Sequence, residues 1–83
     1  GDGAAKEPAP AVGDNEVTAL AVEIRAAIDE APQYFFDLSE MFADRGFQAL
    51  SRAIGQLHEN GELWQDKLGR FCLTGSEYAA EPG

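Results

Sequence analysis

Residues 56–74, QLHENGELWQDKLGRFCLT, decide how this chain is interpreted. The Asn-Gly pair at 60–61 is typical of a helix end, because glycine enters the left-handed backbone region without a steric penalty. Two short runs follow, at residues 62–65 and 70–74, with the four-residue loop 66–69 between them. This arrangement predicts a β-hairpin directly after a helix.

The region before the hairpin predicts a first amphipathic helix over residues 16–31. Its apolar residues recur at spacings of three and four, and Asp14 or Asn15 would serve as the N-cap. Pro32 ends this helix, because the residue before a proline is pushed out of the helical region. The aromatic run at residues 33–36 then suggests a brief strand.

A second, short helix is predicted from a capping pattern. Asp37 would occupy the cap position and Glu40 would reach back to the cap backbone. Leu38, Met41 and Phe42 would lie on the buried side of this helix. The helix would be followed by a turn in which Gly46 takes a positive φ.

A third helix is predicted over residues 47–59. Its apolar stripe comprises Phe47, Leu50, Ile54 and Leu57. The residues that point elsewhere are Gln48, Ser51, Arg52, Gly55, Gln56 and Glu59.

The element order predicts an α+β fold, a winged helix-turn-helix with three helices, a short first strand and a C-terminal β-hairpin wing. We expect residues 1–15 to be a disordered linker or leader, residues 16–75 the winged-helix domain, and residues 76–83 a flexible tail. A generic three-helix domain with a loose C-terminus is the alternative. With 83 residues, the chain is one small domain.

The charge is unevenly distributed. The formal net charge is −9, and residues 16–44 hold seven acids against Arg25 alone. Residues 45–75 hold four bases against three acids, so the half with the third helix and the hairpin is nearly neutral. DNA affinity depends on several lysines and arginines that contact phosphates. The charge pattern therefore disfavours DNA as a partner without excluding it.

The sequence offers little for catalysis. It contains no glycine-rich phosphate loop, nucleophile elbow or metal-ligand cluster, so we expect no enzyme activity, cofactor, metal or small-molecule substrate. His58 is explained by its place near a helix C-terminus. Cys72, the single cysteine, suits a buried strand position, although a redox-responsive thiol stays an alternative. No transmembrane or signal segment is apparent, and the lone cysteine favours the cytoplasm.

The candidate contact surface is the third helix with the hairpin. Arginine and glutamine side chains can contact base edges, and tryptophan is enriched at protein-binding hot spots. Trp64 could instead complete the core beside Phe71, a choice that depends on the hairpin register. The candidates for contact with a partner or with nucleic acid are Gln48, Ser51, Arg52, Gln56, Trp64, Lys67 and Arg70.

Residues 34–63, YFFDLSEMFADRGFQALSRAIGQLHENGEL, also resemble a known family. The aromatic pair Tyr34-Phe35, then Asp37, then the run at 39–42 resemble the small winged-helix D protein of dissimilatory sulfite reductase. The resemblance implies a small acidic accessory protein without catalytic residues. In layout, the chain also resembles the C-terminal winged helices of minichromosome-maintenance helicases and of the middle-sized subunit of replication protein A, which mainly dock proteins.

Two functional hypotheses follow. The first is an accessory or regulatory module that docks on a partner protein, either separate or appended to a larger enzyme. The second is a DNA-binding module of a transcription or replication protein that uses the same face.

Overall fold

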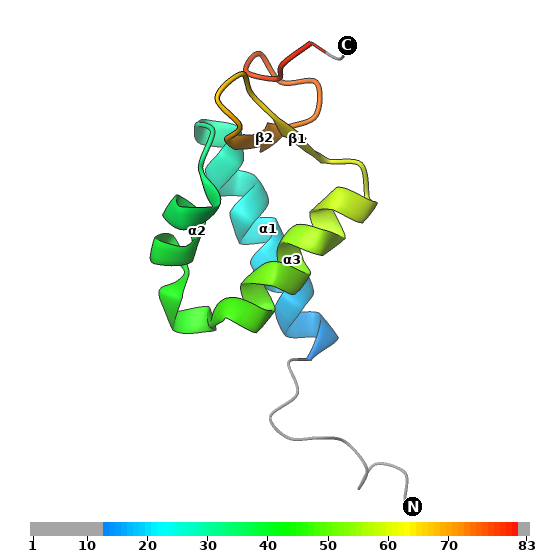
Figure 1. The fold of residues 1–83 in the computed structure, drawn as a ribbon. Helices are drawn as coiled ribbons and strands as arrows, with labels where there is room; N and C mark the ends of the chain where they lie inside the picture. Colours follow the sequence, from blue (N-terminus) through cyan, green and yellow to red (C-terminus); the bar gives the residue numbers. More distant parts are fainter. Residues whose placement is uncertain (1–12, 82–83) are drawn as a thin grey trace, which may run out of the picture.

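The computed structural model describes residues 13–81, which form three helices and a C-terminal hairpin (Figure 1). The predicted α+β class, with three helices followed by a hairpin, is confirmed. Most of the leader predicted at residues 1–15, and the last two residues, lie outside the described part. The elements are α1 (Asp14–Glu30), α2 (Phe35–Met41), a 3-10 turn (Ala43–Arg45), α3 (Phe47–Glu59), β1 (Leu63–Gln65) and β2 (Phe71–Leu73).

Helix α1 begins earlier than its sequence predicted. Gly13 is the N-cap, with no side-chain hydrogen bond, so the predicted caps Asp14 and Asn15 are wrong and both residues lie in the first turn. The helix ends at Glu30, with Ala31 extended, as the following proline requires. At 17 residues α1 is the longest helix, and no helix within residues 13–81 has the length and hydropathy to cross a membrane.

The segment between α1 and α2 is only partly the predicted strand. Gln33 forms a single bridge with Phe71, donating to its carbonyl oxygen at 3.0 Å and accepting from its amide at 2.7 Å. Phe35 already begins α2, because the Asp37 carboxylate accepts a hydrogen bond from the Tyr34 amide at 2.8 Å. Asp37 therefore caps the helix from its third position, and its predicted place at the cap itself is wrong.

Helix α3 has the predicted bounds. Gly46 precedes it with φ 89° and ψ 156°, a conformation that is close to forbidden for residues with a side chain. Asn60 is the C-cap, and Gly61 follows with φ 75°. Both predicted boundary signals are confirmed, because each depends on local backbone conformation.

The hairpin that follows α3 is antiparallel, with Trp64 opposite Cys72. Its strands are each three residues long and shorter than predicted. Leu73 is part of the hydrophobic core, and Leu63 and Phe71 pack against this core. The hairpin thus covers the end of the α1–α3 pair, at the top of Figure 1.

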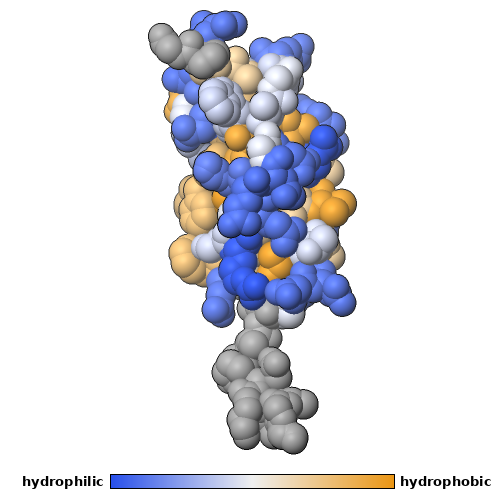
Figure 2. All heavy atoms as spheres, turned by 90° about the vertical axis from the view of Figure 1, so that its right-hand side faces the viewer, coloured by the Kyte–Doolittle hydropathy of each residue, from blue (hydrophilic) through white to orange (hydrophobic). Residues whose placement is uncertain are grey.

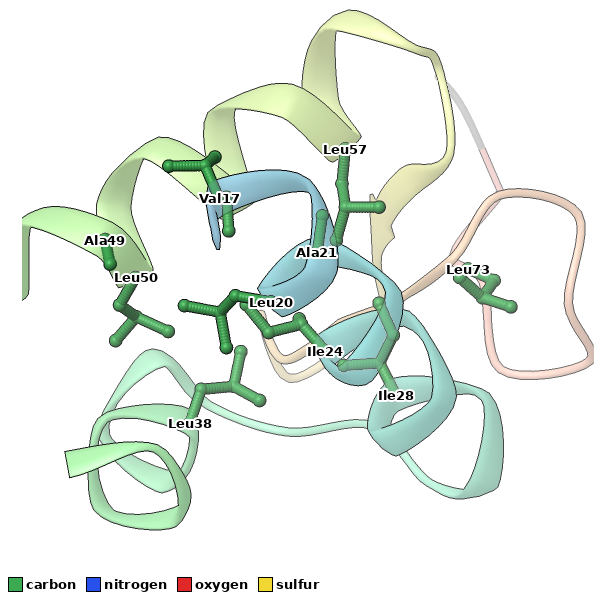
Figure 3. Close-up of a cluster of buried hydrophobic side chains, with 11 residues drawn as sticks. Val17, Leu20, Ala21, Ile24, Ile28, Leu38, Ala49, Leu50, Leu57 and Leu73 are labelled. Carbon is green, nitrogen blue, oxygen red and sulfur yellow. The ribbon is translucent and has the colours of Figure 1, made fainter. Parts of the chain in front are cut away.

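The core is centred on α1, which packs chiefly on α3. Leu20, Ile24 and Leu38 are fully buried and point toward one another from α1 and α2 (Figure 3). The sequence placed Met41 and Phe47 on buried faces, but they are 51% and 71% exposed. The small residues of α3 that do face α1, Ala49 and Ala53, were absent from the predicted stripe.

Candidate interaction surface on α3 and the hairpin

The outward face of α3 carries the predicted polar residues. Gln48 and Arg52 are exposed, and Ser51 and Gln56 are half-buried. The Arg52 guanidinium donates a hydrogen bond to the carboxylate of Asp14 at 3.0 Å. Because Asp14 lies in the first turn of α1, this ion pair ties the two long helices together. The central cation of the predicted contact face is thus already engaged within the domain.

The other three arginines of the chain are paired in the same way. The pairs are Arg25–Glu62 at 2.6 Å, Arg45–Glu23 at 2.8 Å and Arg70–Asp66 at 2.7 Å. Lys67 is exposed and forms no ion pair with another residue in the range 13–81. The positive charge of α3 and the hairpin is therefore largely neutralised inside the domain.

The hairpin loop is organised by Asp66, which is 8% exposed. Its carboxylate accepts hydrogen bonds from the amides of Leu68 and Arg70 at 2.9 and 2.8 Å, and from the Arg70 guanidinium. Burial by itself raises the pKa of Asp66, but these hydrogen bonds outweigh it and hold the pKa below its ordinary value. Arg70 thus stabilises the loop and offers little charge to a partner.

The sequence left open whether Trp64 lies in the core or is exposed to a partner, and the structure shows an intermediate position. Its side chain is 42% exposed, and its indole Nε1 donates a hydrogen bond to the Ala80 carbonyl at 3.0 Å. The amide of Ala80 donates to the Gln65 carbonyl at 2.9 Å, so the chain returns along β1. Residues 76–81 therefore lie against the hairpin, although we expected a flexible tail from residue 76.

A groove of about 740 Å³ runs between α3 and β1. Ile54 and Gly55 form its wall on α3, and Leu63 and Trp64 form the wall on the hairpin. A side-chain carbon placed on Gly55 would meet nothing within 4 Å, so this stretch of α3 is open to an incoming group. The remaining lining residues are Ser51, His58, Gln65, Asp66, Phe71, Ala80 and Glu81.

The groove is lined by the large apolar residues Ile54, Leu63, Trp64 and Phe71 together with polar side chains such as Ser51, His58 and Gln65. Figure 2 shows hydrophilic residues forming a band down the side of the molecule that includes the C-terminal end of α3, with hydrophobic residues at both edges. A concave apolar surface with a polar border is suited to binding an apolar anchor. Of the residues that line the groove, the sequence identified Ser51 and Trp64, but not Ile54, Ala80 or Glu81.

Neither Cys72 nor His58 joins a reactive cluster. Cys72 is fully buried and unpaired, which suits a small apolar core residue. His58 is exposed on the groove wall. Among residues 13–81, no group of three or more His, Cys, Asp and Glu side chains is placed to hold a metal ion.

An aromatic surface that the sequence did not predict lies at the junction of α2 and α3. The rings of Phe35 and Phe47 are 6.0 Å apart in an edge-to-face arrangement. Phe35 is 39% exposed and the adjacent Phe36 is 68% exposed. Helical periodicity had assigned Phe47 to the core because it shares a phase with Leu50 and Ile54.

No protein-family model, curated protein or solved structure matches this chain. The resemblance to the sulfite reductase D protein family accordingly stays a prediction.

Proposed function

We propose that this chain is an acidic winged-helix module that docks on a partner protein through α3 and the hairpin. In this proposal it is an accessory or regulatory element and catalyses no reaction itself. The succession of α2, the turn at Gly46, α3 and the hairpin supports the winged-helix assignment. The resemblance of residues 34–63 to the D protein family supports an accessory role, for a separate protein or for a module appended to an enzyme.

The observation that carries the proposal is that each arginine has a carboxylate partner. A phosphate group that approached Arg52 would meet the carboxylate of Asp14, which lies 3.0 Å from the guanidinium and would repel the phosphate. Asp66 has the same effect at Arg70, where it is nearly buried. A protein partner needs no such cationic surface, because an apolar core with a polar rim supplies specific binding.

The groove supplies that apolar core. Trp64, half-exposed at its edge, has the size and polarity of a hot-spot residue. Gly55 keeps the α3 wall low, although glycine in a helix interior costs about 1 kcal/mol relative to alanine. A glycine at an exposed helical position beside a groove permits close approach by a partner.

The experiment uses short random peptides displayed on phage and selected on the wild-type domain. Each selected peptide is then titrated while the emission of Trp64, the single tryptophan, is recorded. We expect binding to shift this emission and to weaken at least about tenfold in Gly55→Leu, which fills the groove. Gly55→Ala is the matched control and should retain binding, because it adds one methyl group to open space.

The polar rim of the surface is tested separately. Lys67→Glu, at an exposed residue that forms no ion pair within residues 13–81, should weaken capture of the selected peptides while leaving the unfolding transition in urea in place. Selected peptides that bind equally well to this variant and to Gly55→Leu would mean that the docking surface lies elsewhere.

DNA binding is the alternative function, and the outward face of α3 favours it. Gln48 and Arg52 are both exposed there, and these side-chain types can contact adenine and guanine edges. This alternative requires the arginines to exchange their carboxylate partners for phosphates. Binding to random-sequence duplex DNA with a steep salt dependence would favour it.

A further inference from the structure

A second apolar surface lies apart from the α3–β1 groove, at the opposite end of α3. We call it the aromatic patch and define it as Phe35, Phe36 and Phe47. Phe36 and Phe47 are 68% and 71% exposed, and Phe35 packs edge-to-face against Phe47. Phe36 is the residue next to Phe35 on α2. Large exposed aromatic side chains on neighbouring elements are typical of an interaction site.

The charges beside the patch are acidic. Glu40 is exposed one helical turn after Phe36, a spacing that puts both on the same side of α2. The side chain of Asp44, just before α3, is 81% exposed and lies 3.8 Å from Arg45. Arg45 is held more closely by both carboxylate oxygens of Glu23, at 2.8 Å. Exposed carboxylates of α2 and of the turn before α3, Glu40 and Asp44, are therefore close to the patch in the sequence.

The exposed rings and the exposed carboxylates together indicate which class of molecule can bind to the patch. A second copy of the chain would bring its own Glu40 and Asp44 to the interface, and its formal net charge of −9 would add to the overall repulsion between the two copies. Nucleic acid and anionic lipid would be repelled by the same carboxylates. A basic protein segment with interspersed apolar side chains complements both the rings and the acids.

We propose that the aromatic patch binds a basic amphipathic segment of a partner protein. Apolar side chains of the segment cover Phe35 and Phe47, and its arginines or lysines lie over the ring faces or pair with Glu40 and Asp44. A guanidinium placed on an exposed phenyl ring gains cation–π attraction in addition to its ion pair.

The test measures the fluorescence anisotropy of a labelled synthetic peptide. In this peptide leucines recur at helical spacings of three and four residues, and arginines occupy positions between them. The matched peptide keeps every leucine and replaces every arginine with glutamate. We expect the basic peptide to bind and the acidic peptide not to bind. Phe36→Ser combined with Phe47→Ser should weaken binding at least about tenfold, and Glu40→Lys should weaken it and flatten its salt dependence.

The control variant is Leu68→Ser, which removes an equally exposed apolar side chain from the hairpin loop (65% exposed) and should leave binding unchanged. Urea unfolding checks that the phenylalanine variants keep the fold. Undiminished binding by the folded double variant would overturn the proposal, as would equal binding of the acidic peptide. A concentration-dependent dimer of the wild type that Phe47→Ser dissolves would overturn it too, because the occupant would be a second copy. A negative result at the aromatic patch would not affect the proposal for the α3–β1 groove, because binding in the groove is tested separately with the Gly55 variants.

Discussion

The indole Nε1 of Trp64 donates a hydrogen bond to the backbone carbonyl of Ala80 at 3.0 Å. This contact joins the hairpin to a segment 16 residues further along the chain. It holds residues 76–81 beside the groove, so that Ala80 and Glu81 become part of the lining. The accessibility of Trp64 is therefore determined by the C-terminal segment as well as by the register of the hairpin.

A chain that ends at Ser76 should expose Trp64 further. Loss of the Ala80 carbonyl removes the indole partner and the cover over one side of the ring, so we expect a red-shifted emission and stronger quenching by acrylamide. The variant Tyr78→Phe, which removes only the hydroxyl that reaches the Glu30 carbonyl at 3.5 Å, serves as the control and should leave the emission in place. Identical spectra for the truncated and full chains would show that residues 77–83 do not cover Trp64 in solution.

Asp66→Asn should destabilise the hairpin in a pH-dependent manner. The pKa of Asp66 is lowered in the folded state, so its stabilising contribution is present above the unfolded pKa of about 3.9 and is lost as the pH falls through the folded value. At neutral pH we expect the melting temperature to fall by several degrees. The difference in melting temperature between wild type and Asp66→Asn should become smaller as the pH is lowered below the unfolded pKa.

Thermal melts of wild type and Asp66→Asn from neutral to acidic pH measure this difference. Asp44→Asn, with a side chain that is 81% exposed, provides the comparison and should change the melting temperature little at any pH. A gap between wild type and Asp66→Asn that stays constant down to acidic pH would contradict the assignment of the carboxylate as the stabilising group.

Two glycine-to-alanine substitutions should have opposite effects. Gly55→Ala should stabilise the domain by about 1 kcal/mol, because an exposed helical position gains helix propensity and open space receives the methyl group. Gly46→Ala should destabilise it by about 1–3 kcal/mol, because φ 89° with ψ 156° is strained for alanine. Urea unfolding measures the change in the free energy of unfolding for both variants. Changes of the same sign would contradict the backbone conformations assigned to Gly46 and Gly55.

The two apolar residues of α2 that the sequence treated alike should differ sharply. Leu38 is fully buried, so Leu38→Ala should cost about 2–5 kcal/mol. Met41 is 51% exposed, so Met41→Ala should cost well under about 1 kcal/mol. Chemical denaturation separates them, and equal losses would indicate that Met41 is buried as the sequence predicted.

Local signals predicted the order of three helices followed by a hairpin. The bounds of α3 followed from Gly46 and the Asn60-Gly61 pair, which act through backbone conformation alone. The hairpin followed from its turn residues. The start of α2 was misjudged, because the aromatic run at residues 33–36 favours a strand, whereas the Asp37–Tyr34 hydrogen bond lets Phe35 begin the helix.

Long-range contacts could not be predicted from the sequence. The carboxylate of Asp14 looked like a helix cap, but it pairs with Arg52, 38 residues away. Phe47 has the phase of a core residue, yet Ala49 and Ala53 fill the contact with α1. The groove depends on the return of residues 76–81 along β1, and a short polar segment carries no periodic signal for that path.

The central claim is that the arginines of α3 and the hairpin are paired with carboxylates within the domain, so that this surface serves a protein partner. The most direct measurement is a titration of labelled random-sequence duplex DNA with the wild-type domain at about 50 mM salt and at higher salt. We predict no binding at either concentration. Binding at low salt that weakens with a log–log slope near three or four, the number of phosphates that the available cations could neutralise, would contradict the claim.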